Sequence, residues 1–392
     1  MVNLAARLGK GRWRCARNGR ALNAALARPW HDERVNAAFI TMPARPHRRG
    51  LPPMALSLLL AAVLAFGPML LTLDPVAALA RFSNVSANLA FGAFCALLGI
   101  AVVSLAALAI LRRLGVAAPE RSTALFAIAP SLLLQPGLNG LSDAFWIAAC
   151  LMALAAALDR RHMHMLRWWG TALAFDPHAM FVAPLLLALL INRHVPVHRW
   201  AVAPLISLAT LAVLFAIGWP MPGWESVFAG RADGLPPLSA NAPNIWAIVQ
   251  ALPLGALSLS GLARTATIGV SAAYIARFSA QRLNGRSLIA AALLAALIMG
   301  GLLPYQQADC FLLADLLALI LALARHDRAS WRVAMLVQAG SALGLVGDRL
   351  DLPGFAMLGA VALLSATLSL ARTALQPAAN DNPLMARPPA RT

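Results

Sequence analysis

The stretch TALAFDPHAMFVAPLLLALLI, from Thr171 to Ile191, is an apolar segment that carries Asp176, Pro177 and His178 near its middle. A charged residue, a helix breaker and a titratable ring are each costly in hydrocarbon, so the three together need water or a protein cavity. Proline also removes a backbone donor and disfavours helix at the residue before it. The segment is therefore predicted to be two short helices that meet at a wet face.

The composition around this stretch is typical of a polytopic membrane protein. Of the 392 residues, 60% are hydrophobic and only 12% are charged. The formal net charge is +17, but the basic residues stand in short clusters between apolar runs, without a nucleic-acid-binding motif. We interpret these clusters as topology signals and expect no nucleic-acid partner. The four cysteines are single, which indicates small core residues rather than zinc or redox sites.

Apolar windows long enough to cross a bilayer predict an all-α fold, a polytopic integral membrane helical bundle with about eleven transmembrane segments. One of them is a broken helical hairpin. The expected spans are 54–73, 87–111, 123–137, 143–158, the broken pair 168–175 and 178–191, then 200–218, 261–278, 287–303, 311–324, 332–346 and 354–371. The expected domains are a basic cytoplasmic tail (1–50), a transmembrane domain (51–375) and a cytoplasmic C-terminal tail (376–392).

The distribution of arginine supports the break at Asp176. Basic residues near segment ends collect on the cytoplasmic side of a membrane. If the N-terminal tail is inside, the later basic clusters are also inside only when the chain reverses at Asp176-Pro177. A single crossing would place NRHVPVHR, Asn192–Arg199, outside. We therefore expect a multi-pass protein of the cell inner (plasma) membrane with a cytoplasmic N-terminus.

The same threading places most carboxylates at the outer ends of the segments. They are Asp74, Asp143, Asp176, Glu225, Asp233, Asp309, Asp348 and Asp351, among few basic residues, mainly Arg81, Arg231, Arg264 and Arg349. Asp143 follows Ser142 and the turn PGLNG, so it is a candidate helix N-cap, a role that does not exclude a function. Asp315, inside the span 311–324, is interpreted as a structural hydrogen-bonding residue close enough to the outer end to reach water.

Two blocks of sequence resemble the GT-C superfamily of membrane glycosyltransferases, in particular bacterial mannosyltransferase-like members. GLNGLSDAFWIAACLMALAAALDRR, followed by GTALAFDPHAMFVAPLLLALL, is similar to the central block, where an acid precedes a helix and a hairpin of short helices follows. LSANAPNIWAIV, from Leu238 to Val249, resembles the Asn-Ala-Pro-Asn-Trp stretch of bacterial members. The resemblance covers residues 130–325.

The resemblance implies transfer of a hexose or pentose from a polyprenyl-phosphate donor to an envelope lipid or glycan acceptor at the extracytoplasmic face. It implies catalytic carboxylates at Asp74, Asp143 and Asp176, with Asp74 in the place of the family's catalytic acid. The substrate-binding residues that it implies are Asn139, His178, Asn241, Asn244, Gln306 and Gln307. Asp143 and Asp309 are candidate ligands of Mg²⁺ or Mn²⁺, hard cations that accept carboxylates.

Three features depart from the family pattern. The first outer loop is short, the hairpin tip has Asp176-Pro177-His178 where a lysine is common, and the late loop LPYQQADCFLLAD lacks a His-Glu-Arg-Tyr type signature. A degenerate, non-catalytic relative therefore stays open. So does a transporter or flippase, because broken helices are also typical of transporters. Signal-peptide cleavage after Ala78-Leu79-Ala80 is a further alternative, which would remove Asp74.

Overall fold

The computed structural model describes residues 97–127, 138–216, 238–252 and 259–375. They belong to one compact unit and confirm the predicted all-α class. The strands named in this part of the chain, β1 (Ser239–Ala240) and β2 (Gln306–Gln307), are short and pair in parallel.

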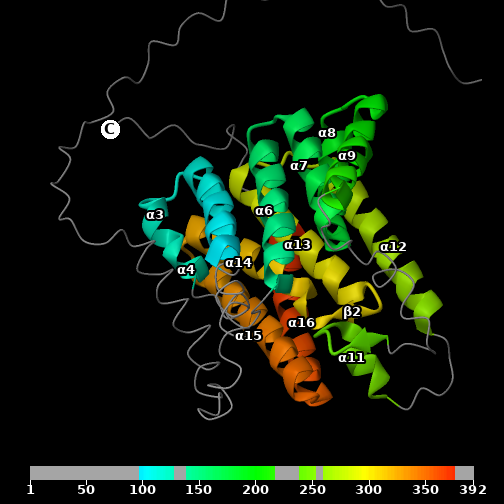
Figure 1. The fold of residues 1–392 in the computed structure, drawn as a ribbon. Coiled ribbons are helices and arrows are strands. Elements are labelled where there is room, and N and C mark those ends of the chain that lie inside the picture. Colours follow the sequence, from blue (N-terminus) through cyan, green and yellow to red (C-terminus); the bar gives the residue numbers. More distant parts are fainter. Residues whose placement is uncertain (1–96, 128–137, 217–237, 253–258, 376–392) are drawn as a thin grey trace, which may run out of the picture. The chain divides into compact units, whose positions relative to one another are not determined.

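The described helices follow one another in the order shown in Figure 1. The first runs over 97–113, and two single turns, α3 (Pro119–Ser122) and α4 (Ala124–Ala127), come after it. The α-helices that follow are α6 (Leu138–Leu158), α7 (His162–Phe175), α8 (Ala183–Asn192), α9 (Val202–Ala216), α11 (Ile245–Gln250), α12 (Leu259–Ser279), α13 (Gly285–Leu302), α14 (Leu312–Arg325), α15 (Arg328–Leu350) and α16 (Pro353–Leu375). Three 3₁₀ helices join them: η1 (Pro177–Val182), η2 (Val197–Ala201) and η3 (Ala308–Phe311).

The predicted helical break at Asp176-Pro177 is confirmed. α7 ends at Phe175, Asp176 is extended with φ −156° and ψ 134°, and η1 begins at Pro177. The Asp176 carboxylate accepts a hydrogen bond of 2.7 Å from the backbone N–H of His178. Proline thus sits in the first turn, where its missing N–H costs nothing, and the aspartate caps that turn.

The two arms of this hairpin return to the same level of the bundle. Arg193, which follows α8, lies 3.1 Å from the Nε2 atom of His162 at the start of α7. The same guanidinium donates to the carbonyl of Ala157, near the end of α6, at 3.2 Å. Across the arms, the indole N–H of Trp169 donates to the carbonyl of Ala179 at 3.0 Å. The chain therefore reverses at Asp176.

The helices have two chemically different ends. We call one the basic end: it holds the end of helix 97–113, the α6–α7 turn, the end of α8 and the α12–α13 turn. At this end the Nε atom of Arg113 lies 2.9 and 3.0 Å from the two oxygens of Asp159, and Asn192 donates to the carbonyl of Ser279 at 2.6 Å. We call the other the polar end, which holds Asp143, Asp176, His178, Asp309 and Asp348. It lies in the lower part of Figure 1, with β2 and α11.

Four helices in the described part are long and apolar enough to cross a membrane: Val197–Ala216, Gly285–Leu302, Arg328–Leu350 and Pro353–Ala374. Large hydrophobic side chains stay exposed on the outer faces of several helices, for example Phe215 on α9 at 73% and Ile268 on α12 at 69%. Lipid would cover such faces. Four is fewer than the eleven or so segments expected. Among the expected spans, 143–158 and 178–191 fall in shorter apolar helices, and 54–73 with parts of 87–111, 123–137 and 200–218 lies outside the described residues, so the larger number stays a prediction.

Asp143 is not a helix N-cap, and that prediction is wrong. α6 begins at Leu138, so Asp143 already lies in its second turn. Its carboxylate accepts a hydrogen bond of 3.4 Å from the indole N–H of Trp146. The glycine and asparagine residues before Asp143 predicted a turn that ends there. In the structure Asn139 and Gly140 are themselves helical. Tertiary packing can override such weak local propensities.

α14 is buried from Leu312 to Ala324. Asp315 lies within it and has no exposed surface, so it does not reach water as expected. Its backbone carbonyl accepts a hydrogen bond of 3.0 Å from the Nε2 atom of Gln338 on α15. The expectation that Asp315 lies close enough to the outer end to reach water is therefore wrong, and its structural role as a hydrogen-bonding side chain stays a prediction.

Glycines allow α15 and α16 to approach each other closely. A Cβ atom added to Gly340 would lie 2.9 Å from the carbonyl oxygen of Gly359. A Cβ atom added to Gly344 would lie 2.5 Å from the Cδ atom of Pro243. A Cβ atom added to Gly359 would lie 2.8 Å from the Cβ atom of Pro243. Small residues of this kind are what close helix packing in membranes requires. Pro243, just before α11, is thus seated against both helices.

Candidate functional site

Carboxylates from three separate segments gather at the polar end. Asp143 comes from α6, Asp176 from the tip of the hairpin, and Asp309 from η3. Their charges act on one another and on His178. Asp348, near the end of α15, also acts on Asp309. The fold therefore assembles four of the residues predicted from sequence, Asp143, Asp176, His178 and Asp309, into one cluster.

Asp176 holds the imidazole of His178 in place. Its Oδ1 atom lies 2.6 Å from Nδ1 of the ring and also accepts the backbone N–H of the same histidine. The ring of Phe181 meets the imidazole edge-on, with 5.3 Å between ring centroids. Because the carboxylate is placed to accept a proton from Nδ1, Nε2 is the ring nitrogen left to accept one from a ligand. Asp176 is thus a positioning residue for His178.

Trp146 joins Asp143 to this pair. It follows Asp143 by three residues on α6, so both side chains lie on one helix face. The indole N–H donates to Asp143, and the indole ring lies 6.3 Å from the imidazole of His178, centroid to centroid. Sequence reasoning did not single out Trp146. The spacing to Asp143 is the signal that identifies it.

Asp309 is half-buried, as Asp143 and Asp176 are. Its Oδ1 atom is buried and has no hydrogen-bond partner among the described residues. Burial raises the pKa of this carboxyl above its ordinary value; the charge that His178 carries when it is protonated opposes that increase, and the negative charge of Asp176 adds to it. Asp309 therefore takes up a proton more readily than an exposed aspartate does.

The strand pair beside the cluster supplies amide groups. Asn241 forms a backbone bridge with Gln307, and its side-chain N–H donates to Asp348 at 3.4 Å. Gln306 is buried, and its Oε1 atom has no hydrogen-bond partner within the described chain. Asn241 and Tyr305 both have positive φ, 57° and 65°, an uncommon conformation for residues other than glycine. Such backbone is often found at binding sites.

The remaining predicted residues divide into three kinds. Asn244 caps α11, since its Oδ1 atom accepts the backbone N–H groups of Trp246 and Ala247 at 3.1 and 3.2 Å. Asn139 lies in the first turn of α6, and its side chain lies outside the described part. Asp74 lies outside the described residues altogether, so its predicted catalytic role stays a prediction.

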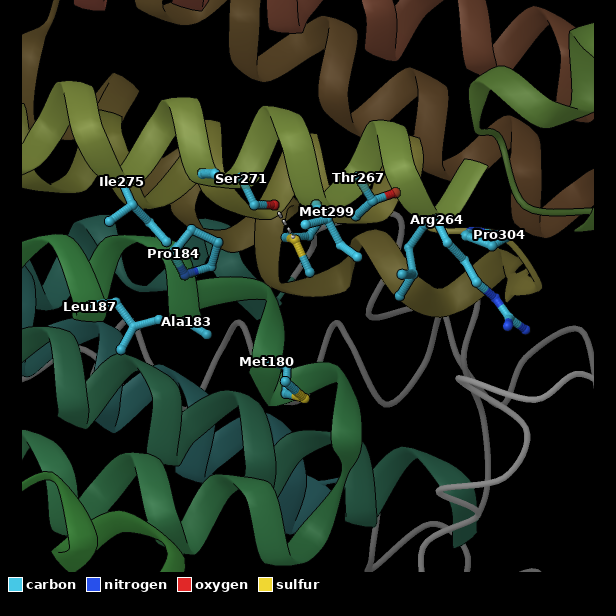
Figure 2. A pocket seen from close by; sticks show the side chains of 13 residues that line it. Met180, Ala183, Pro184, Leu187, Arg264, Thr267, Ser271, Ile275, Met299 and Pro304 are labelled. Atoms are coloured by element: carbon cyan, nitrogen blue, oxygen red, sulfur yellow. Dashed lines mark hydrogen bonds between the residues drawn. The ribbon is translucent and has the colours of Figure 1, made fainter. Parts of the chain in front are cut away.

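An apolar groove begins beside the cluster, between η1 and α8 on one side and α12 and α13 on the other (Figure 2). Its volume is about 530 Å³. Arg264 lies at one end and Ile275 at the other, as Figure 2 shows. Met180 also lines the groove, and it is two residues from His178 on η1. The groove thus connects an apolar surface to the polar end.

Arg264 is a cation at the polar end of this groove. Its guanidinium carbon lies 5.8 Å from the centroid of the Tyr305 ring, a cation–π contact. In the GT-C pattern a lysine is common at the hairpin tip, where this sequence has Asp176-Pro177-His178. The guanidinium comes instead from α12, across the groove from the tip. The sequence feature that could have identified Arg264 as this cation is its place among the few basic residues expected on the outer side.

The described side chains do not fit a metal site made of protein ligands alone. No group of three or more His, Cys, Asp or Glu residues in the described ranges is arranged to hold a metal ion. Asp143 and Asp309, the predicted ligands, supply two carboxylates, whereas Mg²⁺ needs near-octahedral oxygen coordination. Because Mg²⁺ usually binds through one or two carboxylates together with water and substrate phosphate, binding of Mg²⁺ or Mn²⁺ by Asp143 and Asp309 stays a prediction.

Comparison with known proteins leaves the family open. No protein-family model matches the sequence, and no curated protein matches it significantly. The likeness to GT-C glycosyltransferases therefore rests on the two sequence blocks that carry it.

Proposed function

We propose that this protein is a GT-C type membrane glycosyltransferase. It would move a hexosyl or pentosyl group from a polyprenyl-phosphate donor to an envelope lipid or glycan. The observation that carries the proposal is the gathering of Asp143, Asp309 and the Asp176–His178 pair at the polar end, together with an apolar groove lined by Met180 of the same hairpin tip. A lipid-linked sugar has one apolar and one polar part, and it needs two such environments side by side.

The groove would take the isoprenoid chain, with the phosphate next to Arg264. The lining is mostly apolar, and Arg264 lies at one end of the groove, near Pro304. A guanidinium binds phosphate oxygens through charge-assisted hydrogen bonds, which are stronger than neutral ones. It would also neutralise the charge that develops on the leaving phosphate.

The sugar would lie between the groove and the strand pair. Asp309 Oδ1 and Gln306 Oε1 are buried acceptors without hydrogen-bond partners among the described residues. Sugar hydroxyl groups are donors, and a bound sugar would supply the missing hydrogen bonds.

In the proposed reaction, the acceptor hydroxyl oxygen forms a bond to C1 of the sugar. The bond from C1 to the phosphate oxygen breaks, and its electron pair leaves with the polyprenyl phosphate. The hydroxyl proton passes to a base, for which Asp143 and the Nε2 atom of His178 are the described candidates. Asp74, the base implied by the family resemblance, remains a third candidate.

Membrane orientation follows from the charge of the two ends. The arginines of the basic end favour the cytoplasm, so the polar end would face the exterior and the N-terminus the cytoplasm, in a bundle of about eleven segments in the inner membrane. Single cysteines in a cysteine-free background test this. An impermeant thiol reagent added outside should label Asp351→Cys, whereas Arg160→Cys should react only after permeabilisation. The reverse pattern would contradict the orientation.

Donor turnover tests the function. The full chain is placed in vesicles with an envelope extract that supplies lipid and glycan acceptors. Radiolabelled polyprenyl-phosphate hexoses and pentoses are added, with and without Mn²⁺, and transfer of the labelled sugar from the donor is measured. We expect turnover of one donor class by the wild type and little by His178→Gln. Donor binding without turnover would indicate a degenerate relative, and neither binding nor turnover would reject the proposal.

A transporter or flippase is the second candidate, favoured by the burial of Asp315. This ionisable side chain has no exposed surface in α14 and lies beside Gln338 of α15. Ionisable residues inside a membrane often mark ion or proton pathways. Movement of a labelled lipid-linked sugar across the vesicle membrane without transfer, lost in Asp315→Asn, would support this alternative.

A further inference from the structure

A second cavity lies where α11, α12, α13 and α16 meet. Its volume is about 200 Å³, and none of its lining residues lines the groove near Arg264. The lining side chains are apolar except for Asn244 and Thr367. The hydroxyl of Thr367 already donates to the carbonyl of Leu363 at 2.8 Å. Asn244 is therefore the polar group that this cavity can offer to a ligand.

Asn244 brings an unused hydrogen-bond donor to the cavity. The residue is 1% exposed, and its Oδ1 atom is committed to capping α11. Its Nδ2 atom is buried and has no hydrogen-bond partner among the described residues. An unsatisfied buried donor is costly, and native proteins contain few of them. The geometry thus calls for an acceptor that enters the cavity from outside.

The cavity opens toward the lipid-facing surface. Val270 of α12 and Leu364 of α16 line it and are 39% and 42% exposed. Leu368, one turn after Leu364 on α16, is also exposed, at 52%. In a bilayer the molecules that reach this mouth are lipids, and the part that fits an apolar cavity is a hydrocarbon chain.

We propose that this cavity binds an acyl chain of a diacyl glycerolipid, whose ester carbonyl accepts a hydrogen bond from Nδ2 of Asn244. Asn244 stands at the polar end, next to β1, at the level where an embedded bundle would meet the ester groups of the bilayer. A polyprenyl phosphate has no carbonyl group, so this site differs from the groove near Arg264. It also stands or falls independently of the proposed transfer reaction.

Gly301 offers a way to close the cavity. It lines the cavity, and a Cβ atom added to it meets no other atom within 4 Å, so a larger side chain would occupy empty space. Gly269 on α12 also has open space around an added Cβ, but it lines neither cavity. Gly269→Leu is therefore a matched control for Gly301→Leu, with the same change in helix propensity and apolar area.

Photo-cross-linking tests the site directly. The full chain is placed in phosphatidylethanolamine and phosphatidylglycerol vesicles that contain a small amount of a diacyl phospholipid with a diazirine on one acyl chain. After irradiation, labelled peptides are quantified by mass spectrometry. We expect labelling of residues 245–250 and 297–302, lost to background in Gly301→Leu and retained in Gly269→Leu.

Asn244→Ser tests the hydrogen bond. Serine caps a helix about as well as asparagine, and its short hydroxyl is engaged at the cap, so α11 stays intact while Nδ2 is removed. Labelling by the diester probe should fall about three- to tenfold, the range expected for a neutral hydrogen bond. With a diether probe, which has no carbonyl, the wild type and Asn244→Ser should label equally.

Three results would overturn the proposal. The first is unchanged labelling in Gly301→Leu, and the second is equal labelling of wild type and Asn244→Ser by the diester probe. The third is a wild type that shows no labelling at these peptides, which would indicate that another segment of the chain fills the cavity.

Discussion

The basic end and the polar end of the bundle both concentrate charge, but they satisfy it differently. At the basic end, Arg113 meets both carboxylate oxygens of Asp159, with the two side chains 35% and 30% exposed. At the polar end, Asp143 and Asp309 repel each other in a confined space, and Asp309 keeps a buried oxygen without a hydrogen-bond partner in the described chain. A carboxylate that is paired with a neighbouring arginine stabilises the structure. A buried carboxylate oxygen without a hydrogen-bond partner can accept a hydrogen bond from a ligand.

The largest difference between the ends should appear in catalysis. Asp143→Asn keeps size and shape but removes a candidate proton acceptor, so transfer should fall at least about a hundredfold. Asp159→Asn makes the same chemical change at the basic end and should leave transfer within about twofold, since no ligand is expected there. Sugar release from the radiolabelled donor measures both. Equal losses in the two variants would remove the functional distinction between the ends.

The next effect concerns the cation of the polar end. Arg264→Gln should raise the KM for the donor by about ten- to a hundredfold, the scale of one charge-assisted hydrogen bond to phosphate. Arg264→Lys should lose less, because it keeps the charge but not the planar fork. Arg113→Gln at the basic end is the control. An unchanged KM in Arg264→Gln would show that the phosphate binds elsewhere.

A smaller effect is expected in the pH dependence of stability. Because the pKa of Asp309 is raised by burial, the folded protein holds this proton more tightly than the unfolded chain does. Its contribution to the free energy of unfolding therefore declines as pH rises from the ordinary aspartate pKa to the raised one. Thermal unfolding followed by tryptophan fluorescence should show a shallower decline over this pH range in Asp309→Asn. Identical pH profiles would contradict the burial of this charge.

The smallest effect belongs to the ion pair of the basic end. A double-mutant cycle of Arg113→Gln and Asp159→Asn should give a coupling energy of about 0.2–1 kcal/mol, as for other partly exposed pairs. The hydrogen bond from Arg113 lowers the pKa of Asp159, so this coupling is complete above the unfolded-state pKa and is lost as pH falls through the lowered one. A coupling energy well above this range would contradict the view that the Arg113–Asp159 pair is an ordinary, partly solvated ion pair.

The break and the gathering of carboxylates could be predicted from sequence for a physical reason. Pro177 cannot continue a helix, and the arginine clusters restrict the side of the membrane on which each turn lies. Together they place the helix ends that carry Asp143, Asp176 and Asp309 on one side. The charge pattern is read one segment at a time, so it needs no knowledge of which helices are neighbours.

The contacts within the site could not be predicted in the same way. α6 and α13 are apolar almost all round, so hydrophobic periodicity does not show which face packs against which partner. The link from Trp146 to His178 and the position of Arg264 across the groove depend on that rotation. The unused donor of Asn244 also depends on neighbours that are distant in sequence. From the sequence alone, helix capping is a sufficient reason for an asparagine at this position.

Pro243 sets an order of events during synthesis of the chain. Pro243 packs against Gly344 of α15 and Gly359 of α16. These two helices leave the ribosome after all the other described helices. Until those two helices enter the membrane, β1 can already pair with β2, but Pro243 lacks the glycine surfaces against which it packs. The polar end is therefore finished last, and a chain truncated before Arg328 should insert most of its helices and still lack a completed site.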